Sequence, residues 1–260
     1  MVDGGKEVNE TKFDGKGSIY ARNRPSYPQE FIDFLYADIG VNANSIVADI
    51  GSGTGKLTRL LLERGSKVFA VEPNADMRAN AEADLRNYDR FFSINGKAEN
   101  ATLDDCSIDF VTVATAFHWF DKQAFKAECR RILKKDGKVI IVYNSRDEES
   151  DLVKCLYKVN EKYCPDFKGF TGSGMLLRHD SAGFFSDFFT DDYLVKIIEN
   201  NLVYNERGFV ERSLSSSYAL KEGDACFLEY VKELSSLFQE HSMNNELVMP
   251  NITHGYVGTV

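Results

Sequence analysis

The sequence has few of the residues that build disulfide frameworks, metal sites or membrane spans. Its five cysteines are scattered, without a C-x-x-C pair, and they indicate reduced thiols rather than a disulfide frame or a zinc site. Its four histidines include no two that are spaced like metal ligands, so we expect no bound metal. No apolar run approaches the ~20 residues of a membrane-spanning helix, and residues 1–17 lack the apolar core of a signal peptide. These absences favour a cytoplasmic protein with no membrane partner.

Positive charge is also scarce. The chain has 31 Lys and Arg against 40 Asp and Glu, which leaves a net charge of −9. Nucleic acids and anionic membranes usually require a basic patch, so we expect neither as the main partner. The 260 residues are 43% hydrophobic and 27% charged, which suffices for one large α/β domain. The composition leaves open whether the protein is a monomer or a homodimer.

What the sequence does contain is an alternation of strand and helix patterns. Short apolar runs predict buried strands at residues 45–50, 67–71, 91–95, 108–114 and 138–143. Helical spacing predicts helices at residues 56–64, 75–85 and 124–133, the last ending in Lys134 and Lys135, which suit the negative end of the helix dipole. This order predicts a doubly wound, mostly parallel, Rossmann-like sheet with helices on both faces.

After residue 145 the pattern is less regular. We predict a helix at residues 151–163, a strand at 193–204, further helices up to about residue 239, and an antiparallel last strand at 253–260. Residues 165–192 contain six phenylalanines, which predict either an aromatic cap over a pocket or ordinary core packing. With its last strand the sheet would have seven strands.

The most informative segment is residues 49–55, which read Asp-Ile-Gly-Ser-Gly-Thr-Gly between a predicted strand and a predicted helix. Glycines there allow a sharp turn and let a ligand lie against the backbone without Cβ clashes. A phosphate-binding loop would need a G-x-x-x-x-G-K-[ST] pattern, but Leu57 follows Lys56 and Ile50 occupies the first glycine position. A dinucleotide-binding G-x-G-x-x-G pattern would need glycine at position 56. The remaining interpretation is an acidic-x-G-x-G-x-G loop.

Glu72 supports an adenosine-containing ligand. It ends the second predicted strand, about 20 residues after the loop begins. A carboxylate at this position can accept hydrogen bonds from both ribose hydroxyls of an adenosine. Both S-adenosylmethionine and NAD contain that ribose, so this residue alone does not distinguish them.

Several further segments extend the pattern into a family resemblance. The loop resembles the first motif of class I S-adenosylmethionine-dependent methyltransferases, residues 72–77 resemble the second, and residues 96–99 the third. Residues 109–120 resemble the fourth strand and the loop after it, while residues 131–137 resemble the family's turn, with Lys135 and Asp136 in place of its Pro and first Gly. Residues 20–28 resemble the lead segment of small-molecule methyltransferases near the trans-aconitate-methyltransferase-like group. The resemblance covers roughly residues 13–145 and implies a single domain.

The resemblance implies a division of the chain and a set of site residues. The single domain would comprise a lead segment (1–40), an S-adenosylmethionine-binding core (41–145), a cap or substrate region (146–240) and a closing strand (241–260). The implied cofactor-binding residues are Tyr20, Arg24, Asp49, Gly51, Ser52, Gly53, Gly55, Glu72, Pro73, Met77, Ala98, Glu99, Thr115, His118 and Trp119. The implied catalytic residues are His118 and Tyr20.

The resemblance implies methyl transfer from S-adenosylmethionine to a small molecule, leaving S-adenosylhomocysteine, with a carboxylate or hydroxyl as the acceptor group. Arg24 would pair with the carboxylate of the cofactor's methionine part or form a structural salt bridge. His118 would act as a general base or lie against the adenine. The loop after the fourth strand lacks the Asn/Asp-Pro-Pro-Tyr pattern of amino-directed methyltransferases. Two other functions stay open: a non-catalytic S-adenosylmethionine-binding protein and, less favoured, an NAD(P)-dependent oxidoreductase.

Overall fold

The computed structural model describes residues 26–170, 185, 187–216 and 218–260. These residues divide into two units. The first unit contains residues 26–143, 185, 187–198 and 254–260, and the second contains 144–170, 199–216 and 218–253. The predicted cofactor-binding core therefore lies in the first unit almost entirely, while the predicted substrate region, 146–240, contributes to both.

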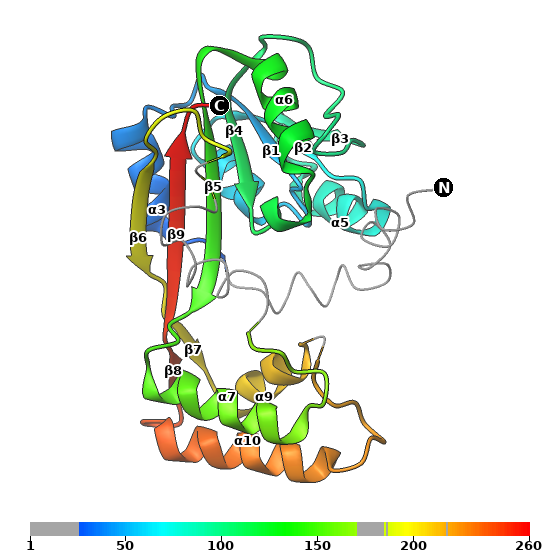
Figure 1. Cartoon of the computed structure of the whole chain (residues 1–260), viewed down its shortest axis with the longest axis vertical. Helices are drawn as coiled ribbons and strands as arrows, with labels where there is room; N and C mark the ends of the chain where they lie inside the picture. Colours follow the sequence, from blue (N-terminus) through cyan, green and yellow to red (C-terminus); the bar gives the residue numbers. More distant parts are fainter. Residues whose placement is uncertain (1–25, 171–184, 186, 217) are drawn as a thin grey trace. The chain divides into compact units, whose positions relative to one another are not determined.

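A seven-stranded sheet organises the first unit. Its spatial order is β3 (Phe91–Ile94), β2 (Lys67–Val71), β1 (Ile46–Ile50), β4 (Ile108–Ala114), β5 (Leu133–Arg146), β9 (Asn251–Gly258) and β6 (Leu194–Glu199). The pairs from β3 to β5 are all parallel. Strand β9 runs opposite to its neighbours β5 and β6 (Figure 1). The predicted doubly wound sheet with an antiparallel last strand is confirmed.

Helices cover the sheet because its strands are apolar on both faces. On one face, Val47, Val68 and Ile140 belong to a core that also contains residues of α3 (Gln29–Phe34), η1 (Leu35–Ile39), α4 (Lys56–Glu63) and α5 (Ala75–Leu85). Residues Ala48 and Val111 point to the other face and are also fully buried. Strands that are buried on both faces have continuous apolar sequences, which is why these strands could be predicted from the sequence.

Polar side chains mark where the helices begin. Asn74 and Asp121 accept hydrogen bonds from the third residue beyond them, at the starts of α5 and α6 (Lys122–Ile132). Ser150 and Asn205 do the same for α7 (Asp151–Tyr163) and α9 (Glu206–Leu214). Each cap satisfies an amide that the helix cannot pair internally, which stabilises the helix by about 1 kcal/mol.

The boundary between α6 and β5 differs from the prediction. Leu133 already pairs with Ile108 of β4, and the register then shifts so that Lys138 pairs with Phe110. Lys134 and Lys135 therefore lie in the irregular start of β5, and the basic residues of the last helical turn are Arg130 and Arg131. The prediction that the two lysines end the helix was wrong because the strand pairs before the Asp-Gly turn.

The lead segment also contains helical structure that the sequence did not predict. Residues of α3 and η1 bury Phe31, Ile32 and Leu35 against the sheet. Gly40 ends this stretch in the left-handed conformation, with φ of 95°. Thus the end of the predicted lead segment is part of the first unit's core.

The second unit is built from helices and a two-stranded sheet. Helices α7 and α9 both pack against α10 (Phe227–His241), as Figure 1 shows, and β7 (Leu202–Tyr204) pairs antiparallel with β8 (Leu247–Met249). Its core includes Leu156, Phe209 and Tyr230. The strand predicted at residues 193–204 is thus two strands, β6 and β7, which belong to different sheets.

The described phenylalanines of residues 165–192 are divided between the two units. Phe167 and Phe170 pack against Tyr157 in the second unit. In the first unit, Phe185 and Phe188 pack against the buried Phe117. Phe170, Phe185 and Phe188 are buried, and Phe167 is partly buried against the second unit's core, which favours the packing interpretation for these described residues. No helix in the described part of the chain is both long and apolar enough to cross a bilayer.

Candidate active site

The glycine loop follows β1 at the carboxyl edge of the sheet. Gly51, Gly53 and Gly55 have φ of 66°, 57° and 79°, all in the left-handed region that favours glycine. The amide of Gly51 donates to the carbonyl of Val71 at 2.8 Å, which ties the loop to the end of β2. A Cβ on Gly51 would lie only 2.8 Å from the Cβ of Ala116, so this glycine also permits close packing against the segment after β4.

Asp49 is an internal anchor for this loop. Its side chain is fully buried, and its two oxygens accept hydrogen bonds from the hydroxyls of Thr58 (2.6 Å) and Thr112 (2.8 Å). Burial raises the pKa of Asp49 to about 6, although the threonine hydrogen bonds oppose this shift. Asp49 stays a predicted cofactor-binding residue, and its two threonine partners connect β1 to α4 and β4.

Glu72 faces the glycine loop from the end of β2. Its Oε2 accepts from the Gly53 amide and its Oε1 from the Asn74 amide, both at 2.9 Å. The residue is 7% exposed, and this burial raises the pKa of its carboxyl above the ordinary value. Each carboxylate oxygen has two lone pairs, so each can accept one more hydrogen bond. The two amide hydrogen bonds thus fix the Glu72 carboxylate beside the glycine loop, with capacity for one more hydrogen bond on each oxygen.

The segment after Glu72 adds an apolar wall. Asn74 caps α5 by accepting from the Met77 amide at 3.0 Å, which fixes where Met77 lies. The Met77 side chain is buried, and its sulfur lies 3.7 Å from the position that a Cβ on Gly53 would occupy. The Pro73 carbonyl accepts from Arg78, 3.2 Å away. Met77 therefore lies against the glycine loop, next to Glu72.

The predicted pair Ala98 and Glu99 follows β3. Ala98 is buried, whereas Glu99 is partly exposed and its Oε1 accepts from the Asp121 amide at 2.9 Å. Glu99 thus connects the end of β3 to the start of α6, and its second oxygen is not used by that bond. Like Asp49, this acid has a structural partner in the protein itself.

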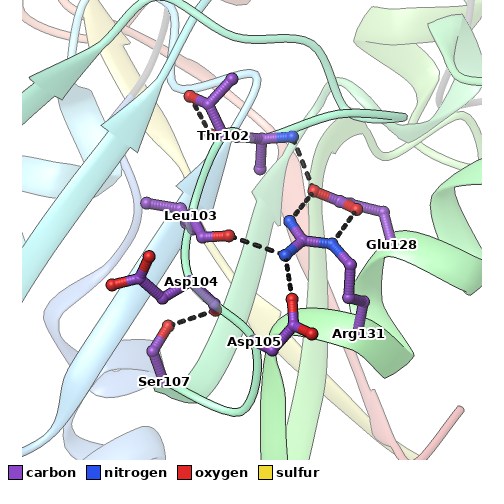
Figure 2. A network of polar contacts seen from close by, with 8 residues as sticks. Thr102, Leu103, Asp104, Asp105, Ser107, Glu128 and Arg131 are labelled. Carbon is purple, nitrogen blue, oxygen red and sulfur yellow. Dashed lines mark hydrogen bonds and ion pairs between the residues drawn. The ribbon is translucent and has the colours of Figure 1, made fainter.

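A polar network fixes the loop that leads from this edge into β4, and Figure 2 shows it. Glu128 accepts from the Ala101 amide at 2.7 Å, while Arg131 donates to the Leu103 carbonyl at 2.8 Å and to Asp105 at 2.5 Å. Burial favours a raised pKa for Glu128, but the hydrogen bonds from Arg131 and Ala101 outweigh it and lower the pKa. Helix α6 therefore holds this loop through two side chains.

The loop after β4 contributes Thr115, His118 and Trp119. Thr115 has φ of 56°, and its hydroxyl lies 3.1 Å from the Tyr27 hydroxyl. The Nδ1 of His118 lies 3.4 Å from the hydroxyl of Tyr143, which is fully buried on β5. Burial raises the pKa of Tyr143, so it stays a neutral hydroxyl beside the imidazole. The side chain of Trp119 is 37% exposed.

The sheet order brings these loops to one edge. Strands β3, β2, β1 and β4 are neighbours and parallel, so the segments that follow them meet where ligands bind in open α/β sheets. Ser52, whose amide also donates to Val71 (3.2 Å), lies in the same loop as the glycines. Tyr20 and Arg24 lie outside the described residues. The described residues include no group of three or more His, Cys, Asp or Glu placed to hold a metal ion.

The comparisons with known proteins agree with this arrangement. The model of a family described as "Methyltransferase domain" matches residues 48–141, from β1 into β5. This part of the chain is a class I methyltransferase domain. The predicted family resemblance is therefore confirmed.

Relatives in sequence match the same region. An uncharacterized methyltransferase of Mycobacterium tuberculosis is 41% identical over 147 residues, which cover 56% of this chain and 58% of that protein. An uncharacterized methyltransferase-like protein of Schizosaccharomyces pombe is 30% identical over 152 residues, 58% of each chain. The chain thus matches somewhat more than half the length of these curated relatives, so the similarity concerns the methyltransferase domain.

Solved structures share the fold over more of the chain. A candidate type II methyltransferase from Anaeromyxobacter dehalogenans superposes with a TM-score of 0.65 at 20% identity, covering 91% of this chain and 97% of that one. The YcgJ protein of Bacillus subtilis gives 0.54 at 16% identity, covering 90% and 100%. At these identities the likeness concerns the fold.

Sequence reasoning missed several residues that support the methyltransferase domain's site. Thr58 and Thr112 hold Asp49, and Tyr143 lies beside His118, but none of them belongs to a motif with a fixed spacing. Asn74 could have been found, because an Asn directly before a predicted helix is a typical cap. Thr112 and Tyr143 reach their partners only through the pairing of β1, β4 and β5, while Thr58 reaches Asp49 from α4.

Proposed function

We propose that this protein is an S-adenosylmethionine-dependent methyltransferase that transfers a methyl group to a small-molecule acceptor by in-line displacement. The observation that carries the proposal is the Glu72 carboxylate, held by two backbone amides with acceptor capacity remaining on each oxygen. Ribose hydroxyls are donors that match such a pair of acceptors. The methyltransferase domain surrounding this residue supports the same conclusion.

The residues present fit an adenosyl ligand. Gly53 leaves the space of a side chain open, since among the described residues a Cβ there would have only the Met77 sulfur within 4 Å, at 3.7 Å. Met77 and Ala98 offer buried apolar surface for an adenine, next to the carboxylate that would hold the ribose. Ser52 and the glycines line the turn between them.

When bound, S-adenosylmethionine supplies an electrophilic methyl group on a sulfonium, and the transfer itself requires no metal. The protein's task is to bind, to orient and to exclude water, and positioning of this kind can contribute about 7–11 kcal/mol. His118 is the candidate general base for a hydroxyl acceptor, with Tyr143 orienting its ring. A carboxylate acceptor would need no base, and His118 would then serve to position the ligand. Tyr20 and Arg24 keep their predicted roles.

Two other functions would use the same site differently. A non-catalytic S-adenosylmethionine-binding protein would keep the Glu72 and Gly53 arrangement without turnover. An NAD(P)-dependent oxidoreductase is less favoured, because α4 begins at Lys56, where the dinucleotide pattern has a glycine.

A ligand titration tests the proposal directly. We expect S-adenosylhomocysteine and S-adenosylmethionine to raise the melting temperature, and NAD and NADP to leave it unchanged; a ligand at 100 times its Kd adds about 2.7 kcal/mol of stability. Glu72→Gln should weaken S-adenosylhomocysteine binding by about 10- to 100-fold, since hydrogen bonds to a charged group contribute about 1.5–3 kcal/mol. Glu63→Gln, an exposed acid on α4, is the matched control.

Each outcome has a clear meaning. Stabilisation by a nicotinamide cofactor instead of the adenosyl-sulfur compounds would overturn the proposal. Unchanged affinity in Glu72→Gln would remove this residue from the ribose site. Tight binding without transfer of a labelled methyl group to any member of a broad acceptor panel would favour the non-catalytic function.

A further inference from the structure

The segment after β3 begins with the only Asn-Gly pair in the sequence, Asn95-Gly96. Asn95 directly follows the last residue of β3 and is exposed. In such a pair the backbone nitrogen of the glycine can attack the asparagine carboxamide and close a five-membered ring, because no Cβ on the glycine obstructs the approach. The pair is therefore a chemically reactive position in the first unit.

The attacking nitrogen is not engaged within the described structure. The next amide along the chain, that of Lys97, donates to the Asn100 carbonyl at 3.1 Å. The Gly96 amide, in contrast, donates to no acceptor among the described residues. Attack by this nitrogen therefore breaks no hydrogen bond of the described fold. Gly96 itself is buried, but the ring forms between neighbouring residues, and water reaches it at the exposed Asn95.

Arg78 of α5 lies beside the carboxamide that would be attacked. Its Nη1 lies 3.3 Å from Asn95 Oδ1. The same nitrogen donates to the carbonyls of Glu72 (2.8 Å) and Pro73 (3.2 Å), which hold the guanidinium in place. A guanidinium has only donors, so the carboxamide faces it with its oxygen. Attack on the carboxamide carbon places negative charge on that oxygen, and a fixed cation nearby stabilises this charge.

We propose that Asn95 is a self-catalysed deamidation site, with the Gly96 nitrogen as nucleophile and Arg78 as the group that stabilises the oxyanion. A bond forms between the Gly96 nitrogen and Asn95 Cγ, and the bond from Cγ to Nδ2 breaks. The proton of the attacking nitrogen leaves with Nδ2 as ammonia. One water molecule then opens the ring at either carbonyl and gives aspartate or isoaspartate.

The isoaspartate product would disturb the residues that follow. It adds one methylene to the backbone directly before Gly96, where space is lacking. A Cβ on Gly96 would lie 3.0 Å from Val71 Cγ1 and 3.2 Å from the Ala101 carbonyl oxygen. The same segment contains Ala98, a predicted cofactor-binding residue. Deamidation should therefore lower the affinity for S-adenosylhomocysteine, and this consequence, unlike the reaction itself, rests on the proposed function.

Peptide mapping by mass spectrometry tests the reaction. The full-length protein is incubated at pH 7 and pH 9, and the replacement of NH₂ by OH is followed at each asparagine. We expect Asn95 to convert at least tenfold faster than Asn87, which is also exposed but precedes the bulky Tyr88 and lacks such an arginine contact among the described residues. The rate should rise with pH, because the attacking nitrogen has to lose its proton.

Variants of α5 test the role of the arginine. Arg78→Gln removes the cation and should slow the conversion of Asn95 by roughly tenfold, while Arg78→Lys, which keeps a charge, should be intermediate. Arg86→Gln, at the exposed residue that ends this helix, is the matched control and should convert like the wild type. A loosened structure has the opposite sign, because a mobile chain reaches the ring geometry more easily.

The proposal is overturned if Asn95 converts no faster than Asn87, or if both Arg78 variants convert as fast as the wild type or faster. Calorimetry with S-adenosylhomocysteine on fresh and aged samples tests the consequence. Affinity should fall in proportion to the isoaspartate fraction, and Asn95→Gln, which would need a six-membered ring, should keep its affinity on ageing. If Asn95 converts but the aged protein binds as well as the fresh one, the predicted consequence is wrong. If the fresh protein does not bind, the proposed function fails while the deamidation site stands.

Discussion

The two units assemble their polar groups in different ways. In the first unit, backbone amides and a few acids act within short segments, such as residues 49–55 and 72–77, that directly follow parallel strands. In the second unit, polar partners come from elements far apart in the sequence, as Tyr230 of α10 and Asn160 of α7 do. A loop that works through its backbone imposes spacing and glycine on the sequence. A polar pair made by side chains of two distant elements does not.

Gly51→Ala should have the largest effect, because it disrupts the glycine loop of the first unit. The new Cβ would lie 2.8 Å from the Cβ of Ala116 and 3.1 Å from the Phe120 ring, at a φ of 66°. Strain and overpacking should together lower the free energy of unfolding by about 2–4 kcal/mol and abolish S-adenosylhomocysteine binding. Urea denaturation measures the first effect and calorimetry the second.

Gly40→Ala is the control for Gly51→Ala. Its φ is 95°, but a Cβ there would meet no atom of the described residues within 4 Å, so only the backbone strain remains. If both variants lose the same stability, close packing of the loop is not what requires glycine at position 51.

Asp49→Asn tests whether the buried carboxyl of Asp49 lowers the free energy of unfolding at neutral pH. Burial raises the pKa of Asp49 from 3.8 to about 6, so the folded protein binds this proton more tightly than the unfolded chain. The group therefore lowers stability as the pH rises from about 4 through 6, by on the order of 2–3 kcal/mol. Asp49→Asn should remove that decrease, measured as the difference between wild-type and variant unfolding free energies at pH 4 and pH 7.

Asp89→Asn, an exposed substitution in the same unit, corrects for the other titrating groups. If the difference between wild type and Asp49→Asn is the same at both pH values, the pKa of Asp49 is not raised by folding.

Tyr230→Phe tests the second unit and should have the smallest effect of these substitutions on the free energy of unfolding. The Tyr230 hydroxyl donates to Asn160 at 2.8 Å, and both residues are almost fully buried in the second unit. Its loss leaves the Asn160 oxygen without this donor and should lower the free energy of unfolding by about 1–2 kcal/mol. The affinity for S-adenosylhomocysteine, measured by calorimetry, should not change.

Tyr163→Phe serves as the comparison for this substitution, because the Tyr163 hydroxyl bonds to the partly exposed Glu233 and its removal should matter less. A parallel loss of cofactor affinity in Tyr230→Phe would mean that the second unit supports the cofactor site energetically.

The same contrast explains how much could be predicted from the sequence. The helices at residues 75–85 and 151–163 and the strand at 108–114 have the predicted bounds, because Asn74 and Ser150 cap the two helices and a continuous apolar run forms the strand. The glycine loop and Glu72 were predicted as site residues from their spacing, and Met77 from the family resemblance. Their geometry required the structure, since Gly53 reaches Glu72 through the pairing of β1 with β2. In the same way, Thr112 reaches Asp49 through the pairing of β1 with β4.

The failures have physical causes as well. Strands β7 and β8 have three residues each, too few for a periodic pattern, and their partial exposure weakens the apolar contrast. The lead segment's helix was missed because it begins after Pro28 with no side-chain cap. Tyr143 looked like an ordinary strand residue, and only the pairing of β5 with β4 brings it to His118.

The place of β9 in the sheet has a consequence for synthesis. This strand lies between β5 and β6, although both of those precede it in the chain. A ribosome therefore makes the whole glycine-loop region, and the second unit up to residue 250, before residues 251–258 can join β5 to β6. Until then the edge of β5 stays open, and a partly made chain exposes a strand that can pair with other chains. Completion of the sheet has to wait for this late segment, so chaperone demand should peak just before it emerges.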